Sequence, residues 1–275
     1  MNVETAAEQL FFSTVRLEHA GGVGTSFIVQ HAWAEDKQGL FLVTNKHVIA
    51  GATKARFFFT LAEGTNAKIG DIVEIALDEF EQGWTGHPDD AVDVAAAPLV
   101  PLLNQLDKEG RQPFIKAIPT TIVPTVEQAS KELDAIEEVF FIGYPIGIYD
   151  TVNLLPVARR GTTATPFSLD YCGKPAFLID ASVFPGSSGS PVLIFNKGSY
   201  SPREGGVVVA SRMLLLGIVA SVLVHEQDGK LDFIDVPTTL TPRVRTPELA
   251  DLGIVFKSRT IVETIEALLH KYGEL

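Results

Sequence analysis

Ser188 lies in a run of small residues that could present a nucleophile, the segment FPGSSGSPV at positions 184–192. A nucleophilic serine needs a tight turn that exposes its hydroxyl. Neighbouring glycines let backbone N–H groups point at the oxygen that becomes negative during acyl transfer. The pattern predicts Ser188 as the nucleophile and the N–H groups of Gly186 and Ser188 as an oxyanion hole. The alternative is a glycine-serine hairpin turn without chemistry, because such turns are common.

His47 follows the apolar segment FLVT at positions 41–44, where a predicted strand runs into a short polar turn. A neutral imidazole, whose unperturbed pKa is about 6.5, can accept the serine proton and return it to the leaving amine. His47 is therefore the predicted general base. The alternative is a histidine satisfied by a backbone carbonyl, and we assign the other histidines to that class: His19, His31, His87, His225 and His270.

Asp93 precedes the apolar run VAAAPL at positions 94–99, so we expect its side chain to be drawn toward the interior. A buried carboxylate needs a partner. The Nδ1–H of His47 is a suitable one, because a carboxylate there fixes the imidazole tautomer and stabilises the imidazolium. The alternative is a solvated loop acid, and Asp89 and Asp90 lie close enough to be mistaken for Asp93.

The order histidine, aspartate, serine, together with four local motifs, resembles the chymotrypsin-like serine proteases. The motifs are GVGTSFIV at 22–29, TNKHV at 44–48, DVA at 93–95 and GSSGSP at 186–191. Within that superfamily the sequence is most similar to the bacterial HtrA-type branch. The similarity to that branch lies in FIGYPIG at 141–147, RGT at 160–162 and LGIVF at 252–256. The resemblance covers roughly residues 10 to 270.

The resemblance implies a serine endopeptidase that cleaves protein or peptide substrates through an acyl-enzyme, with no metal and no cofactor. HtrA-type proteins usually carry a PDZ module after the protease, and we expect none here because the chain ends at Leu275. Ser187 replaces the aspartate that digestive members use in zymogen activation. Ala220 replaces the serine that supports the triad aspartate, so Asp93 needs another donor. The rival hypothesis is a latent protease-fold binding protein whose loops 144–155 or 184–187 await an activating partner.

The resemblance also predicts where the substrate side chain before the scissile bond would bind. Ser182 occupies the position at the base of the primary pocket, and it offers no acid to pair with Arg or Lys. Ala220, Ser221 and Val222 would form the strand along the pocket, with Val222 at its mouth, where many relatives have glycine. We therefore expect a shallow pocket and cleavage after small aliphatic residues such as Ala or Val.

Short segments rich in Val, Ile, Phe and Thr, separated by Gly and Pro, predict many strands and few long helices. Such strands are expected at 13–17, 25–30, 40–44, 54–60, 72–77, 139–142, 176–179, 191–195 and 214–224. Helical spacing predicts a closing helix over 258–272, with Ser258 as its N-cap, and a shorter helix over 126–133.

These elements predict an all-β fold, which the resemblance makes two six-stranded Greek-key β-barrels with a C-terminal α-helix. The expected units are an N-terminal barrel at 1–110, a connection at 111–134 and a C-terminal barrel with the closing helix at 135–275. In this arrangement the first barrel contributes His47 and Asp93, and the second contributes Ser188 and the oxyanion hole.

The composition excludes several other classes of protein. The chain carries 22 Lys and Arg against 34 Asp and Glu, a net charge of −12, so a general grip on nucleic acid is not expected. Its one cysteine, Cys172, cannot form an intrachain disulfide, which suits a reducing, cytoplasmic location. We expect no secretory leader, because residues 1–17 carry Glu4 and Glu8 with no basic start, no long apolar run and no cleavage signal. We expect no membrane contact, because no run reaches about 18 apolar residues. No histidine pair has the spacing of metal ligands.

Overall fold

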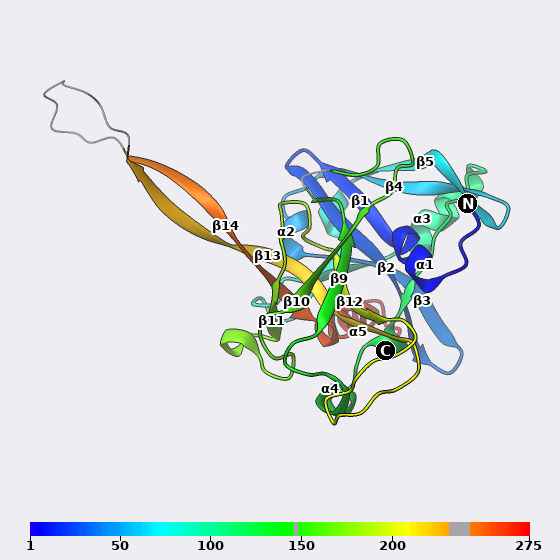
Figure 1. The fold of residues 1–275 in the computed structure, drawn as a ribbon. Helices are drawn as coiled ribbons and strands as arrows, with labels where there is room; N and C mark the ends of the chain where they lie inside the picture. Colours follow the sequence, from blue (N-terminus) through cyan, green and yellow to red (C-terminus); the bar gives the residue numbers. More distant parts are fainter. Residues whose placement is uncertain (146–147, 231–242) are drawn as a thin grey trace, which may run out of the picture.

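The computed structural model describes residues 1–145, 148–230 and 243–275, and its strands greatly outnumber its helices (Figure 1). The first half contains α1 (Ala6–Ser13), β1 (Thr14–His19), β2 (Gly22–Ala34), β3 (Lys37–Thr44), α2 (Lys46–Ile49), β4 (Lys54–Glu63), β5 (Asn66–Asp78), β6 (Thr85–Gly86), β7 (Ala95–Pro98), α3 (Val100–Lys108) and β8 (Ile118–Pro119). The second half contains α4 (Val126–Glu132), β9 (Glu138–Gly143), β10 (Val157–Thr163), β11 (Ala176–Asp180), β12 (Pro191–Asn196), β13 (Arg212–Lys230), β14 (Arg243–Lys257) and α5 (Arg259–Lys271). Every predicted strand overlaps an observed one.

The first half forms one eight-stranded sheet rather than the expected six-stranded barrel. Its strands follow the order β5-β4-β1-β2-β3-β7-β6, and β8 pairs parallel to β2. Among the described residues the end strands β5 and β6 do not pair with each other, and β6 is only two residues long. The hydrogen bonding of this sheet therefore does not close into a barrel. The prediction of a mostly β fold is confirmed, with one closed barrel, but the prediction of two Greek-key barrels is not.

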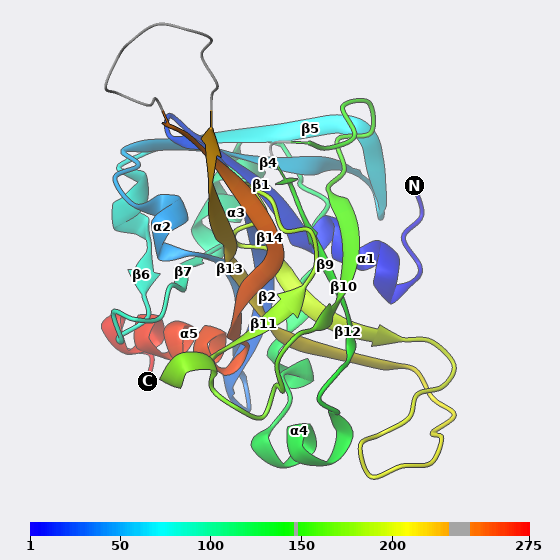
Figure 2. The same cartoon turned by 60° about the vertical axis from the view of Figure 1, so that its left-hand side comes forward.

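The second half is a closed barrel of six strands in the order β10-β11-β14-β13-β12-β9. Two of its strands, β13 and β14, continue their antiparallel pairing beyond the barrel as far as Lys230 and Arg243. Figures 1 and 2 show these strands leaving the body of the molecule as a two-stranded ribbon. The predicted strand 214–224 was therefore too short.

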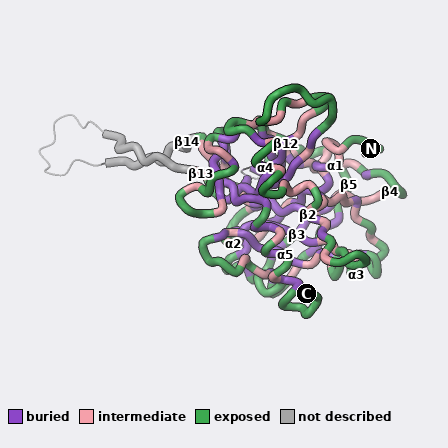
Figure 3. The backbone as a smooth tube through the Cα atoms, turned by 90° about the horizontal axis from the view of Figure 1, so that it is seen from below, coloured by how far each residue is buried: buried purple, intermediate pink, exposed green. Residues whose placement is uncertain are grey.

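A central core joins the two halves, as the buried tube segments in Figure 3 show. It combines apolar side chains of the first sheet, the barrel and the closing helix, among them Phe27, Phe41, Leu193, Leu215, Ile261 and Ile265. Since α5 lies at the end of the chain and also packs near β6 and β7, it fastens the barrel to the first sheet.

Both predicted helices are confirmed, as α4 and α5. The side chain of Ser258, however, does not cap α5, because Ser258 itself has helical backbone angles. Three further α-helices in the described part of the chain were not predicted, α1, α2 and α3. The start of α1 has a readable signal, since Thr5 and Glu8 form a reciprocal capping box.

Candidate active site

His47 and Asp93 form a direct pair. His47 Nδ1 lies 2.5 Å from Asp93 Oδ2, and the backbone N–H of His47 donates to Asp93 Oδ1 at 3.0 Å. The second bond supplies the donor that Asp93 needed once Ala220 had replaced the family serine. About half of the His47 side chain is exposed, so the imidazole edge remains open to a substrate.

Local packing explains why these two side chains meet. His47 lies in the first turn of α2, directly after β3, and Asp93 precedes β7, the strand that pairs with β3. Val92 and Val94 are buried on either side of Asp93, which leaves the carboxylate facing the histidine. The side chain of Asn45, wholly buried, donates through Nδ2 to the carbonyl of Asp93 at 2.6 Å and fixes the loop.

Ser188 occupies a tight turn between β11 and β12 that depends on two glycines with positive φ. Gly186 has a φ of +89° and Gly189 a φ of +88°. A Cβ at Gly189 would lie 1.8 Å from the carbonyl oxygen of Thr25, so no other residue fits without displacing the backbone. The turn is thereby pressed against β2, and against Thr44, three residues before His47.

Thr25 on β2 holds this turn through both its backbone and its side chain. Its N–H donates to the carbonyl of Ser188 at 3.0 Å, and its Oγ1 donates to the carbonyl of Gly186 at 2.9 Å. The same Oγ1 accepts from the N–H of Tyr144 at 3.0 Å, and the carbonyl of Thr25 accepts from Thr44 Oγ1 at 2.7 Å. Thr25 stood inside one of the family motifs, but the sequence reasoning assigned it no role.

The proposed oxyanion groups are available for a ligand. In the part of the chain that the structure describes, the N–H groups of Gly186 and Ser188 donate to no protein acceptor. The N–H of Ser187, which lies between them, is used by Phe184 at 2.9 Å. The Ser188 hydroxyl donates to the carbonyl of Ala220 at 3.0 Å, and no hydrogen bond joins it to His47.

A family model described as "Trypsin-like peptidase domain" matches residues 24–199, a span that contains His47, Asp93 and Ser188. The chain belongs to the trypsin-like peptidase family. The HtrA-type protease AlgW, solved with a decapeptide, is 13% identical, with 98% of this chain and 68% of AlgW covered and a TM-score of 0.52. This likeness supports the predicted resemblance to the HtrA type at the level of the fold.

Other solved serine proteases match at lower structural similarity. An inactive form of Rv3671c from M. tuberculosis H37Rv is 17% identical, with 97% of this chain and 90% of that chain covered and a TM-score of 0.45. The serine protease of a human pathogenic astrovirus is 13% identical, with 90% and 89% covered and a TM-score of 0.41. No curated protein matches the chain.

The residues predicted to bind substrate in this trypsin-like peptidase differ in how exposed they are. Ser182 and Ser221 are exposed, Ala220 is buried, and its carbonyl is taken by the Ser188 hydroxyl. Val222 is half-buried and packs against the core cluster that contains Val183. Nothing in this arrangement encloses Ser182, so the primary pocket stays a prediction.

The remaining reactive side chains have structural surroundings. His87 pairs with Glu263 at 2.9 Å, and buried His31 bonds through Nδ1 to Thr120 at 3.0 Å. Cys172 is a free, exposed thiol in a short turn, and the side chain of His225 lies outside the described residues. No group of three metal-binding side chains occurs within the described ranges, and none of their helices is long and apolar enough to cross a membrane.

Proposed function

We propose that this trypsin-like peptidase is a serine endopeptidase in which Ser188 is the nucleophile, His47 the general base and Asp93 the residue that orients His47. The observation that carries the proposal is that the Ser188 turn is hydrogen-bonded to Thr25, whose carbonyl accepts from Thr44, three residues before His47. These contacts support the proposal, because they link the Ser188 turn to the end of the strand that precedes His47.

In the proposed reaction the Ser188 hydroxyl attacks the scissile carbonyl while His47 accepts its proton. Asp93 stabilises the imidazolium that forms. The negative oxygen of the tetrahedral intermediate receives the two unused N–H groups of Gly186 and Ser188. His47 then returns the proton to the leaving amine, and water releases the acyl group by the same steps.

Rotation of the Ser188 side chain from Ala220 toward His47 is the conformational step that this mechanism requires. Side-chain hydroxyls change rotamer readily, because staggered χ1 positions are close in energy. A substrate would favour the change if its own N–H took over the Ala220 carbonyl. The proposed enzyme therefore needs no large rearrangement to become active.

The test compares Ser188→Ala with Ser201→Ala, a serine on an exposed loop. The first substitution is expected to lower kcat by about 10⁶ and to abolish labelling by a fluorophosphonate probe. The second is expected to leave both unchanged. Labelling that persists in Ser188→Ala, or peptide hydrolysis at the wild-type rate, would exclude Ser188 as the nucleophile.

For the substrate we propose cleavage after small aliphatic residues. The supporting features are the absence of an acid at Ser182 and the branched side chain of Val222 near the predicted pocket mouth. A mixed peptide library is expected to yield mainly ends in Ala or Val. Dominant cleavage after Arg, Lys or Phe would refute this preference.

The single cysteine supports the further proposal of a reducing, cytoplasmic location.

The rival proposal is a latent protease-fold binding protein, and the bond between Ser188 and Ala220 favours it. A latent protein should resist the fluorophosphonate probe alone and react only after lysate is added. An active enzyme should react in both conditions. Part of its predicted activation loop, residues 146–147, lies outside the described residues.

A further inference from the structure

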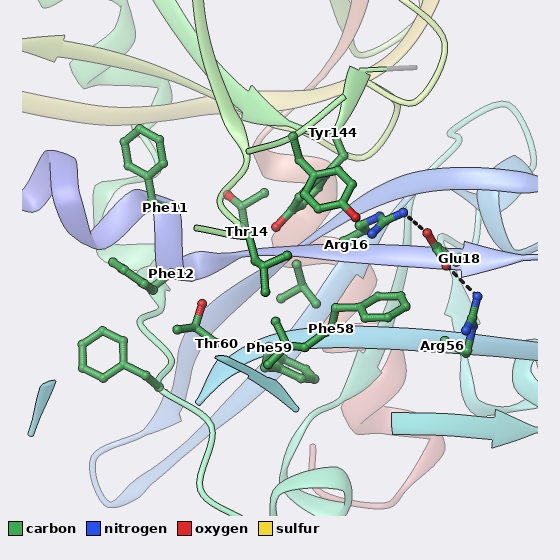
Figure 4. A pocket seen from close by; sticks show the side chains of 15 residues that line it. Phe11, Phe12, Thr14, Arg16, Glu18, Arg56, Phe58, Phe59, Thr60 and Tyr144 are labelled. Atoms are coloured by element: carbon green, nitrogen blue, oxygen red, sulfur yellow. Dashed lines mark hydrogen bonds and ion pairs between the residues drawn. The ribbon is translucent and has the colours of Figure 1, made fainter. Parts of the chain in front are cut away.

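A cavity of about 290 Å³ lies between the first sheet and the segment after β9, and none of the triad residues lines it. Residues of β1 and β4 line one side, and Tyr144, which follows β9, lies across from them (Figure 4). Tyr149 and Leu154 from the same segment also line the cavity. We call it the Arg16 pocket, after a guanidinium that lines it. The proposed reaction makes no use of it.

Strand register connects this pocket to the nucleophile turn. Thr25 on β2 pairs with Arg16 on β1, which pairs with Phe58 on β4. Directly paired residues project from the same face of a sheet, and neighbouring strands lie about 4.8 Å apart. The row therefore leads from Thr25, which holds the Ser188 carbonyl, to Phe58 in about 10 Å.

The segment that forms the opposite wall also begins beside Thr25. The N–H of Tyr144 donates to Thr25 Oγ1, so the segment that covers the pocket is attached to the residue that clamps the turn. A chain that leaves the active site over Thr25 would pass between the sheet and this segment.

The pocket has the chemistry of a site for an aromatic group attached to a peptide. The Arg16 guanidinium lies 4.1 Å from the ring centre of Tyr149 and 5.1 Å from that of Phe58. Glu18 lies between Arg16 and Arg56 and is bonded to both, as Figure 4 shows. Arg16 Nε is buried without a hydrogen-bond partner. Buried donors are normally satisfied, and a peptide carbonyl would satisfy this one after a small shift of the Arg16 side chain.

The side of the active site on which the pocket lies indicates which half of the substrate would reach it. The turn is bonded on one side to β13, where Val219 accepts from the Gly189 N–H and where the acyl half is predicted to bind. On the other side it is bonded to Thr25. A substrate that crosses Ser188 therefore sends its leaving half over Thr25.

We propose that the Arg16 pocket binds an aromatic side chain in the leaving half of the peptide substrate, an inference that rests on the proposed endopeptidase function. An extended peptide advances about 3.3 Å per residue, so 10 Å corresponds to the third or fourth residue after the scissile bond. The ring packs beside the Arg16 guanidinium, against the aromatic side chains that line the cavity, and a backbone carbonyl of the same segment accepts from Arg16.

A binding experiment tests the pocket without catalysis. The full chain carrying Ser188→Ala is titrated with three tetrapeptide amides, one all alanine, one with phenylalanine at the third position and one with phenylalanine at the fourth. The phenylalanine peptides are expected to bind about tenfold more tightly. Adding Tyr149→Ala or Phe58→Ala should remove this difference, whereas Tyr272→Ala, an exposed tyrosine outside the pocket, should preserve it. Equal binding of all peptides, or a preference that survives both pocket substitutions, would overturn the proposal.

A kinetic experiment separates the pocket from the proposed function. With wild-type catalytic residues, Tyr149→Ala should lower kcat/KM about tenfold for a quenched peptide with phenylalanine at the preferred position. It should leave hydrolysis of an activated ester, which has no leaving-side residues, unchanged. If Ser188→Ala binds the phenylalanine peptide as expected but the wild type neither labels nor hydrolyses the ester, the endopeptidase function fails and the pocket stands. If ester hydrolysis is normal and the peptides are cleaved equally, the pocket fails alone.

Discussion

At the residue scale, Thr25 shows how a side chain that touches no reacting atom can position those that do. Its Oγ1 joins the Gly186 carbonyl to the Tyr144 N–H in a wholly buried site. Thr25→Val keeps the shape of the side chain but removes its hydrogen bonds to the Gly186 carbonyl and the Tyr144 N–H. The peptide groups of the turn that carries the predicted oxyanion hole are then held less firmly. We expect kcat to fall about ten- to a hundredfold with little change in KM, since one whole oxyanion donor is worth roughly 10²–10³.

The matched control for this prediction is Thr25→Ser, which keeps the hydroxyl and should retain most of the activity. Steady-state kinetics and the rate of fluorophosphonate labelling measure the effect, and thermal unfolding detects any general loss of structure. Similar activity of the valine and serine variants would show that the side-chain bonds do not position the turn.

His31 provides a prediction for pH and stability. Burial lowers the pKa of this histidine, and the more distant charge of Glu266 opposes the shift only in part. The unfolded chain therefore binds a proton more readily than the folded protein does. Stability should be full above about pH 6.5 and should fall as the pH drops from there toward the lower folded-state pKa.

Replacement of the buried group isolates its contribution. Urea unfolding is measured between pH 7.5 and pH 5, an interval that includes the ordinary histidine pKa of about 6.5. The loss of stability as the pH falls should be smaller for His31→Gln than for the wild type. His270→Gln, at an exposed position on α5, should keep the wild-type slope. Equal slopes for all three proteins would contradict the assignment to His31.

At the scale of the element, the turn between β11 and β12 depends on the absence of a side chain at Gly189. Gly189→Ala should prevent the turn from forming, because its Cβ meets the carbonyl oxygen of Thr25. Gly205→Ala is a matched control, since Gly205 has a similar φ of +92° but open space around it. The control should cost only about 1–2 kcal/mol of backbone strain.

The measurement for this pair is probe labelling alongside the free energy of unfolding. Gly189→Ala is expected to lose labelling and more stability than Gly205→Ala. If both variants label like the wild type, the close approach of the turn to β2 is not required for its function.

At the scale of the whole molecule, the shared core predicts that the two halves unfold together. Ile265 on α5 is fully buried in that core, so Ile265→Ala should cost about 2–5 kcal/mol. Hydrogen exchange in β3 and in β12 should accelerate by the same factor, because both strands contribute to the core. Glu266→Ala, one residue further and exposed, should change stability by less than about 0.5 kcal/mol. Acceleration confined to β12 would show that the halves are independent.

Much of the fold and the triad could be read from the sequence because their signals are local. Short segments rich in Val, Ile, Phe and Thr predicted the strands, since β-branched and aromatic side chains pack well on a pleated sheet. His47, Asp93 and Ser188 each stood beside a short motif with its own chemical reason. The start of α1 was readable too, through Thr5 and Glu8, but the capping signal was not used.

Tertiary structure decided what depends on distant contacts. The sequence could not show that the first sheet stays open, because closure depends on whether its end strands meet. It could not show the donor to Asp93, the role of Thr25 or the orientation of the Ser188 hydroxyl, since each is fixed by a residue from another strand. The Arg16 pocket is the clearest case, because strand register and the returning segment after β9 together bring its walls within reach of one ligand. Sequence patterns set which way a side chain faces, and packing alone sets what it meets.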